Sequence, residues 1–474
     1  MAAIAPAIIP ARVRPRLTSP VVRDTMPCGP RLHQPMNRYL LKSTIVAALG
    51  GLLFGFDTVV ISGATSTLSE VYHLTPMLLG FTVASALLGT VLGSMFAAAP
   101  SDRYGRRQCL QSLAVLYVVT ALGCALAWNW YAFVWFRFVG GLAIGGSSVI
   151  GPMYIAEIAP AAKRGRLVGL FQFNIVAGIL IAYLSNYVIG TLGFGTEEWR
   201  WKLGVAILPA LFFFLNLFGI PQSPRWLIRR GFIEEAHQIF TRIGEPDPER
   251  EVADVVRSVE TEDRTKVEPL FQHKYRRPIF LAIAIGFFNQ MSGINAILYY
   301  LNDIFKSAGF DKVSSDLQAV AIGATNLLFT IIAMSVIDRL GRKKLLLTGA
   351  CGTALCLAGV AVVFASGHGE RFLVWLLIGF IGFFAFSQGA VIWVYLSEVF
   401  PNLVRAKGQS LGSFTHWIMN AIIAFTFPLV AHLSRPAPFV FFAVMTVVQF
   451  FVVWRLFPET AGVTLEDMQQ KMES

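Results

Sequence analysis

Residues 44–64 read TIVAALGGLLFGFDTVVISGA, an apolar run long enough to cross a bilayer as one helix. Its single charged residue is Asp57. A carboxylate inside the hydrocarbon core costs a few kcal/mol, so such a residue is a functional candidate by default. Arg137 is the other strong charge that lies comparably deep in an apolar run. One acid and one base, each alone in its own helix, indicate a buried pair whose charge state can change.

The composition indicates a membrane protein. Hydrophobic residues make up 55% of the chain and charged residues only 14%, whereas soluble domains carry about 25% charge. Apolar runs of bilayer length recur along almost the whole chain and predict about twelve spans. These are 44–64, 77–99, 108–127, 131–156, 166–190, 201–220, 277–306, 315–337, 344–365, 372–398, 408–432 and 437–457. Gly89-x-x-x-Gly93 and Gly141-x-x-x-Gly145 would allow close helix crossings.

The placement of the charges argues against nucleic acid as the partner of this chain, although the net charge is +11. Lys and Arg cluster in alternate short loops. The clusters are Arg103, Arg106, Arg107; Lys163, Arg164, Arg166; Arg225, Arg229, Arg230; Arg339, Arg342, Lys343, Lys344; and Arg405, Lys407. Cytoplasmic loops carry this excess of basic residues, so we expect a multi-pass protein of the cell membrane with both termini in the cytoplasm.

Three motifs occur twice. DRYGR at 102–106 returns as DRLGR at 338–342, YIAEIAPAAKR at 154–164 as YLSEVFPNLVR at 395–405, and PQS at 221–223 as PET at 458–460. The spacing of 236 to 241 residues corresponds to six spans, so both copies share one membrane orientation. The fold expected is therefore an all-α membrane protein of twelve transmembrane helices in two pseudo-symmetric six-helix bundles.

The repeat also sets the expected domain boundaries. An N-terminal leader (1–40) precedes the first bundle (41–222), a cytoplasmic linker (223–275), the second bundle (276–460) and a C-terminal tail (461–474). The linker is either flexible or helical, and the spacing of its apolar residues favours short amphipathic helices. Residues 1–36 lack the apolar core of a signal peptide. A disordered tail and a later true start codon are the preferred explanations, and a transit segment is the third.

Several motifs in this order resemble the sugar porter family of the major facilitator superfamily. They are the glycine-rich run 51–63, DRYGRR at 102–107, PMYIAE at 152–157, PQSPRWL at 221–227, QMSGIN at 290–295 and PET at 458–460. The resemblance covers about 50–462. It implies alternating access, in which a sugar site between the bundles opens to one side of the membrane at a time.

Span seven carries the side chains expected to bind sugar. A pyranose presents hydroxyl groups and apolar faces, which amides and aromatic rings recognise. Span seven offers Asn289, Gln290, Asn295 and Tyr299. By resemblance Gln172, Asn326, Trp393, His416, Trp417 and Asn420 join the site. Hydrogen bonds between helices and core packing of the tryptophans are the alternative roles.

The resemblance also assigns two sets of charged residues. In proton-coupled relatives an Asp at the position of Asp57 faces an Arg at the position of Arg137, and a static structural ion pair is the alternative. A cytoplasmic latch would hold the inner side closed, unless its charges only set the topology. The latch residues are Arg106, Glu157, Arg164, Arg342, Glu398 and Arg405.

Four departures from the family pattern are visible. Asn289 replaces the first Gln of the usual pair, Ala390 stands where Pro is frequent, and His416 stands where Gln or Asn is usual. These three bear on the identity of the sugar, and Gln222 in place of Glu bears on the latch. His416 is either a sugar contact, which we prefer, or a proton relay.

The function expected is proton-coupled symport of a monosaccharide, a hexose such as glucose, by a monomer. A sugar uniporter is the first alternative and a non-transporting sugar sensor the second, although the short tail after Gly462 disfavours a sensor. No nucleophile–base constellation or phosphate loop suggests an enzyme or a cofactor. The five Cys (28, 109, 124, 351, 356) have no metal-ligand spacing.

Overall fold

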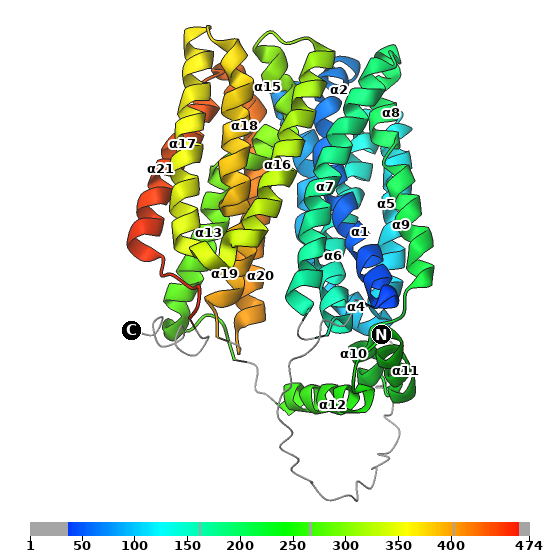
Figure 1. Cartoon of the computed structure of the whole chain (residues 1–474). Helices are drawn as coiled ribbons and strands as arrows, with labels where there is room; N and C mark the ends of the chain where they lie inside the picture. Colours follow the sequence, from blue (N-terminus) through cyan, green and yellow to red (C-terminus); the bar gives the residue numbers. More distant parts are fainter. Residues whose placement is uncertain (1–36, 161–162, 265–267, 402, 464–474) are drawn as a thin grey trace, which may run out of the picture. The chain divides into compact units, whose positions relative to one another are not determined.

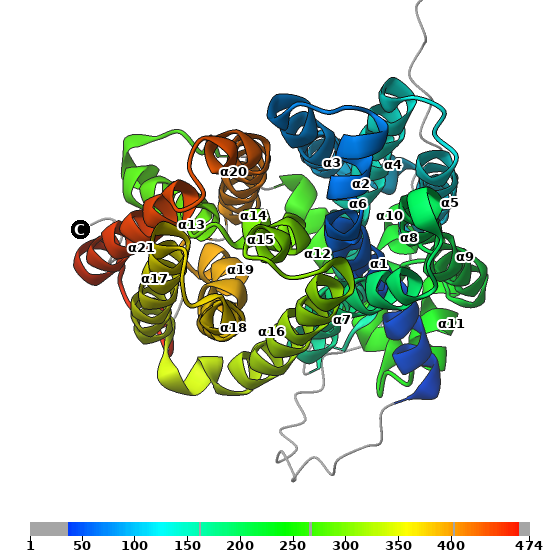
Figure 2. The ribbon, with the colours of Figure 1, turned by 90° about the horizontal axis from the view of Figure 1, so that it is seen from above.

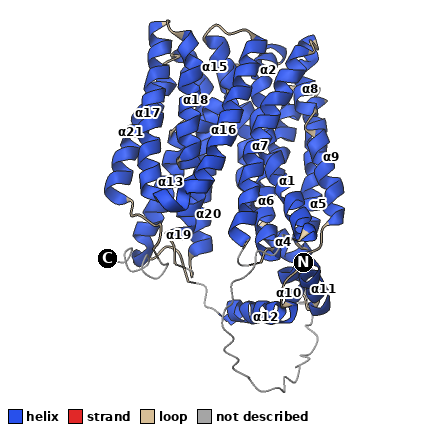
Figure 3. Cartoon of the chain, viewed as in Figure 1, coloured by secondary structure: helices blue, strands red, loops and turns tan. Residues whose placement is uncertain are grey.

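The computed structural model describes residues 37–160, 163–264, 268–401 and 403–463. Within these ranges the chain is helical and contains no β-strand (Figure 3). From Asn37 onwards the chain forms one compact unit. The leader prediction for residues 1–36 and most of the predicted tail, from 464 onwards, lie outside the described residues.

The first bundle contains the elements from the start of the described chain to Gly219. They are α1 (Arg38–Val60), η1 (Ile61–Gly63), α2 (Thr65–Val71), α3 (Pro76–Phe96), α4 (Ala98–Tyr104), α5 (Arg106–Ala125), α6 (Trp130–Ile158), α7 (Arg164–Thr191), η2 (Gly195–Glu197), α8 (Glu198–Gly204), α9 (Ile207–Asn216) and η3 (Leu217–Gly219).

Three helices of the linker follow: α10 (Pro224–Arg229), α11 (Ile233–Ile243) and α12 (Pro248–Arg264). The second bundle contains η4 (His273–Tyr275), α13 (Arg276–Met291), α14 (Ile294–Tyr299), α15 (Leu301–Ser307), α16 (Lys312–Leu340), α17 (Arg342–Ser366), α18 (Glu370–Phe386), α19 (Gln388–Glu398), α20 (Arg405–Leu433) and α21 (Ala437–Leu456). Figure 1 shows the two bundles side by side.

Twelve helical segments of the described chain are long and apolar enough to cross a membrane. They coincide with the twelve predicted spans, so the predicted fold class is confirmed. Three spans are broken inside: span six between α8 and α9, span seven between α13 and α14, and span ten between α18 and α19. The structure has three helices, α10–α12, between the bundles. The domain boundaries themselves stay predictions.

The outer surface of the bundles is apolar. Large side chains such as Trp135, Phe212, Leu355, Trp375 and Phe451 are each more than half exposed. In water this would be an extensive exposed hydrophobic surface, whereas a bilayer would cover it.

Glycines bring α3 and α6 into close contact. A Cβ atom at Gly141 would overlap the carbonyl oxygen of Ala86, and one at Gly89 would overlap that of Phe138. Gly93 and Gly145 lie against Leu142 and Thr90 in the same way. The two predicted small-residue motifs therefore pack against each other, which confirms the close crossing expected of them.

Two helix pairs make the largest contacts between the bundles: α3 packs against α20, and α7 packs against α16 (Figure 2). Smaller contacts join α1 to α14, and η1 to α14 and α15. The linker helices α10–α12 lie near the start of α1, where Asn37 Nδ2 donates to the carbonyl oxygen of Arg242 at 3.0 Å (Figure 1). We call this end of the bundles the linker end. The opposite end, which carries η1, α8, α15 and the start of α16, is the distal end.

The glycine crossing generates a stability prediction. Gly141→Val should lower the melting temperature of the purified protein and its monodisperse fraction in detergent, because overpacking a tight contact costs about 1–3 kcal/mol. Thermal unfolding and size-exclusion chromatography measure both. Gly165→Val is the matched control, since no heavy atom lies within 4 Å of a Cβ atom there. Equal behaviour of the two variants would show that the close crossing does not limit stability.

Candidate functional site

Asp57 and Arg137 form an ion pair between α1 and α6. Nη1 of Arg137 donates to both carboxylate oxygens of Asp57, each at 3.0 Å. The Arg137 side chain is 4% exposed and that of Asp57 is 24% exposed. A charge buried in this way needs a partner of the opposite sign. Apolar helices hold both side chains inside their spans, in the part nearer the end at Gly63 and the start at Trp130. The prediction that the two residues meet is confirmed.

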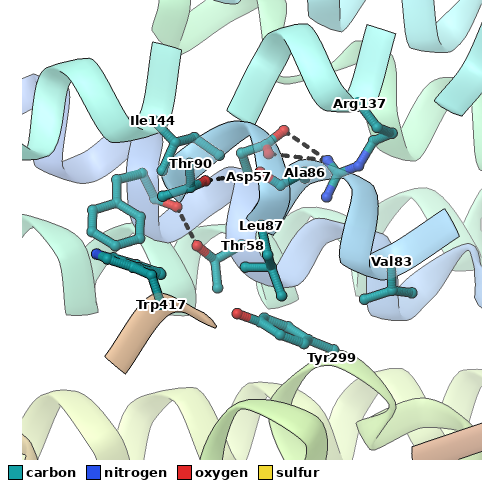
Figure 4. A pocket seen from close by; sticks show the side chains of 11 residues that line it. Asp57, Thr58, Val83, Ala86, Leu87, Thr90, Arg137, Ile144, Tyr299 and Trp417 are labelled. Carbon is teal, nitrogen blue, oxygen red and sulfur yellow. Dashed lines mark hydrogen bonds and ion pairs between the residues drawn. The ribbon is translucent and has the colours of Figure 1, made fainter. Parts of the chain in front are cut away.

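A pocket adjoins this ion pair and is lined by both bundles. Asp57, Thr58 and Arg137 line it from the first bundle, and Tyr299 and Trp417 line it from the second. Figure 4 shows Tyr299 and Trp417 on one side of the pocket and the ion pair on the other. The pocket therefore lies where a movement of one bundle against the other would change the surroundings of Asp57.

The break in span seven creates a cluster of amides. Gly293 has a φ of 79°, a left-handed conformation that glycine adopts without strain, and it separates α13 from α14. Gln290 Nε2 donates to Asn289 Oδ1 at 3.0 Å, and Asn295 Nδ2 donates to Gln290 Oε1 at 3.0 Å. Gln290 and Asn289 are almost fully buried. Broken helices of this kind line substrate sites in transporters built from repeats.

His416 connects the amides to two tryptophans. Gln290 Nε2 lies 3.2 Å from Nδ1 of His416. The ring centre of His416 lies 5.3 Å from that of Trp393 and 5.0 Å from that of Trp417. Trp393 is 38% exposed although it lies inside a span. Side chains from α13, α14, α19 and α20 thus combine amides that both donate and accept with aromatic surfaces.

The remaining predicted site residues take different places. Asn420 Nδ2 donates to the hydroxyl oxygen of Tyr299 at 3.0 Å, which ties α20 to α14. Gln172 on α7 is half-buried and Asn326 on α16 is 9% exposed. Neither side chain makes a hydrogen bond within the described part of the chain. Both lie on the helix pair that joins the bundles.

At the linker end the first copy of the repeated motif forms a buried ion pair. Nε of Arg106 lies 2.9 Å from Oε2 of Glu157, and the Arg106 side chain is 4% exposed. The hydroxyl of Ser223 donates to the same Glu157 oxygen. Gln222 Oε1 accepts from the backbone N–H of Arg107 at 3.0 Å, at the start of α5.

The second copy repeats this geometry. Nη2 of Arg342 lies 2.8 Å from Oε1 of Glu398, and Thr460 Oγ1 donates to Oε2 at 2.6 Å. Glu459 accepts from the backbone N–H of Arg342 at 2.8 Å. Ser223 and Thr460 escaped the sequence-based site prediction, although the repeated PQS and PET motifs contained the signal. Each of these ion pairs joins residues of one bundle.

Of the other predicted latch residues, Arg164 is exposed and Arg405 donates to the carbonyl oxygen of Phe400 at 3.3 Å.

Comparison with known proteins identifies the family. Residues 43–472 match the family described as "Sugar (and other) transporter". The chain is 35% identical to the D-xylose-proton symporter of Escherichia coli (92% of this chain, 96% of that protein). It is 35% identical to the arabinose-proton symporter of Bacillus subtilis (91% and 95%) and 34% identical to the glucose transport protein of Synechocystis (91% and 97%).

Solved structures agree with the sequence relatives. The inward open conformation of the xylose transporter XylE from E. coli is similar with a TM-score of 0.82 and 33% identity, covering 91% of this chain and 100% of that one. The proton:xylose symporter XylE bound to 6-bromo-6-deoxy-D-glucose is similar with a TM-score of 0.74 and 34% identity (92% and 99%). The chain therefore belongs to the sugar transporter family of the major facilitator superfamily and is a membrane transporter, not an enzyme.

Proposed function

We propose that this transporter is a proton-coupled monosaccharide symporter that works by alternating access. The observation that carries the proposal is the Asp57–Arg137 ion pair beside a pocket that Tyr299 and Trp417 of the other bundle also line. A carboxylate that pairs with an arginine inside a span can bind and release a proton as its surroundings change. The relatives named as proton symporters support this proposal.

The amide cluster supports a neutral polyhydroxyl substrate. Asn289, Gln290 and Asn295 donate and accept hydrogen bonds but carry no charge, and here they bond to one another. A pyranose would exchange these mutual bonds for bonds to its hydroxyl groups, and Trp393 would pack against its apolar face. If these hydrogen bonds only hold the helices together, replacing Gln290 should leave the KM for sugar transport unchanged.

Coupling would run through α14. This short helix carries Asn295 from the amide cluster and Tyr299 from the pocket beside Asp57. A sugar that orders Asn295 would thereby fix the position of Tyr299 against the ion pair. Protonation of Asp57 would weaken its attraction to Arg137 from the other side of the same pocket. Two ligands that bias one conformational equilibrium are coupled by thermodynamic necessity.

The identity of the sugar remains a prediction. We expected a hexose such as glucose, whereas relatives of nearly equal similarity are named for xylose, arabinose and glucose. Asn289 and His416 stand where the family pattern has other side chains, and both touch Gln290. Pentoses and hexoses therefore have to be compared side by side.

We further propose the orientation in the cell membrane. The motifs around Arg106 and Arg342 and the linker helices α10–α12 occupy the linker end, which the excess of basic residues assigns to the cytoplasm. The distal end then faces the outside. The proposed working unit is the monomer, because the pocket and the amide cluster are built within one chain.

A sugar uniporter is the second candidate. Arg137 is almost fully buried, and an ion pair at such a place can serve to hold α1 against α6. In that case Asp57 would stay charged throughout the transport cycle. Sugar would then equilibrate across the membrane without any response to a proton gradient.

Asp57→Asn should abolish proton-driven accumulation. The Asn side chain has no acid–base equilibrium near neutral pH, so it cannot pick up a proton on one side of the membrane and release it on the other. The variant should therefore still exchange or equilibrate sugar but should not concentrate it. The measurement is uptake of labelled glucose, xylose and arabinose into proteoliposomes, with and without an inward proton gradient. Asp254→Asn, an exposed change in the linker helix α12, is the matched control and should behave as the wild type. Accumulation by Asp57→Asn equal to the wild type would exclude Asp57 as the proton site.

Gln290→Ala should raise the apparent KM for the transported sugar about fivefold or more. The change removes hydrogen bonds whose net worth is about 1–3 kcal/mol. His416→Gln should keep the KM within about threefold of the wild-type value, because an amide side chain also donates and accepts hydrogen bonds. Concentration-dependent uptake measures both values, with Gln238→Ala on α11 as an exposed control. An unchanged KM in Gln290→Ala would remove the amide cluster from the sugar site.

A further inference from the structure

A cluster of four charged residues, three of them buried, joins the two bundles at the distal end. Lys202 Nζ lies 2.8 Å from Oε1 of Glu198 and 2.9 Å from Oδ2 of Asp316. Lys312 Nζ lies 2.8 Å from the other oxygen of Glu198. We call Glu198, Lys202, Lys312 and Asp316 the distal quartet. The sequence singled out only Asp57 and Arg137 among the charges of the spans, but Lys202 and Asp316 are as deeply buried.

Ionic contacts and hydrogen bonds hold the quartet together. The fully buried ammonium of Lys202 donates to Asp316 Oδ2 at 2.9 Å and to the carbonyl oxygen of Gly63 at 3.2 Å, and its contact with Glu198 Oε1 is an ion pair without a hydrogen bond. Asp316 is 1% exposed and also accepts from Asn302 Nδ2. Asn302 Oδ1 in turn accepts from the hydroxyl of Ser62 at 3.4 Å. Because the partners of Lys202 and Asp316 come from both bundles, the positions of these buried charges depend on how the bundles lie against each other.

The four charges are divided evenly between the bundles. Glu198 and Lys202 belong to α8 of the first bundle, and Lys312 and Asp316 belong to α16 of the second. The contacts Lys202–Asp316 and Lys312–Glu198 therefore cross the interface. Each bundle contributes one acid and one base, so neither carries a net charge from the quartet into the interface.

The spacing on each helix adds a second set of partners. Glu198 and Lys202 lie four residues apart on α8, and Lys312 and Asp316 lie four residues apart on α16. Acidic and basic side chains at this spacing are neighbours on one helix face and attract each other. If the bundles separated here, each charge would still have an opposite charge on its own helix. The quartet can therefore form contacts across the interface when the distal end is closed, and contacts within α8 and within α16 when it is open.

We propose that the distal quartet is an exchangeable clasp that holds the distal end closed and lets it open without leaving a charge alone. The inference rests on the proposed alternating access, in which this end must open once in each cycle. In the closed state Lys202 contacts Asp316 of the other bundle as well as Glu198 of its own helix, and Lys312 contacts Glu198. In the open state Lys202 would keep Glu198, and Lys312 would pair with Asp316, four residues away on α16. The clasp sets the ratio of distal-open to distal-closed molecules and contributes nothing to sugar contact.

Two variants move this ratio in opposite directions. Asp316→Asn removes an attractive charge across the interface and should raise the open-to-closed ratio about tenfold. The double variant Glu198→Lys with Lys312→Glu should lower it about tenfold. That exchange gives the first bundle two bases and the second two acids, so attraction across the interface grows while the pairs within each helix become repulsive. If the variants acted only by disturbing a stabilising ion pair, both of them would raise the open-to-closed ratio.

Distances between spin labels at the exposed positions Leu192 and Leu433 measure the ratio in nanodiscs. The labelled protein has its native cysteines replaced and is first shown to transport sugar. Asp311→Asn is the matched control, since it is the same chemical change on an exposed residue that caps α16. Thermal unfolding confirms that each variant is folded, and the quadruple charge reversal of the quartet should restore the wild-type ratio.

The clasp is overturned if Asp316→Asn gives the same ratio as Asp311→Asn, or if the double variant raises the ratio. If either result is found in a protein that accumulates sugar in response to a proton gradient, only the clasp is wrong and the proposed function stands. If the distal ends never separate in any variant and no sugar moves, the proposed alternating access is contradicted as well.

Discussion

The arrangement of this protein depends on the fact that a bilayer offers no water to a charged group. Each charge that enters the spans must find its partner inside the protein, and Asp57 finds it in Arg137 across two helices of the first bundle. At the distal end Lys202 and Asp316 meet the same requirement across the two bundles. A charge that changes its protonation or its partner therefore changes the energy of the whole arrangement of helices.

The broken spans place the polar chemistry beside these charges. Gly293 interrupts span seven, so Gln290 and Asn295 come from two helices and still bond to each other. Tyr299 follows on the same short helix and lines the pocket beside Asp57. A single helical turn, from Asn295 to Tyr299, thus connects the amide cluster with the pocket beside Asp57. The ion pairs at the linker end stay within their own bundles. The described inter-bundle ion pairs lie at the distal end.

Most of the fold was predictable because apolar runs of bilayer length and a six-span repeat are strong signals. The meeting of Asp57 and Arg137 was predictable for the same reason, since an isolated charge in such a run has few partners. Lys202 and Asp316 were missed because they lie at the ends of predicted spans, where a long side chain ordinarily reaches water. The roles of Ser223 and Thr460 were missed because their hydroxyl groups are uncharged, and the prediction of the linker-end residues rested on charged side chains. The mutual hydrogen bonds of the amides depend on the break at Gly293, which periodicity alone does not reveal.

We propose that sugar and protons cross the membrane together through one site, and the proton movement that follows the addition of sugar measures this coupling. Unlabelled sugar is added to weakly buffered proteoliposomes without any imposed gradient, and a dye records the external pH. The account predicts that the medium becomes more alkaline with the wild type when a transported sugar is added, and that Asp57→Asn gives no change. Entry of labelled sugar at an unchanged pH in the wild type would contradict the account and identify a uniporter.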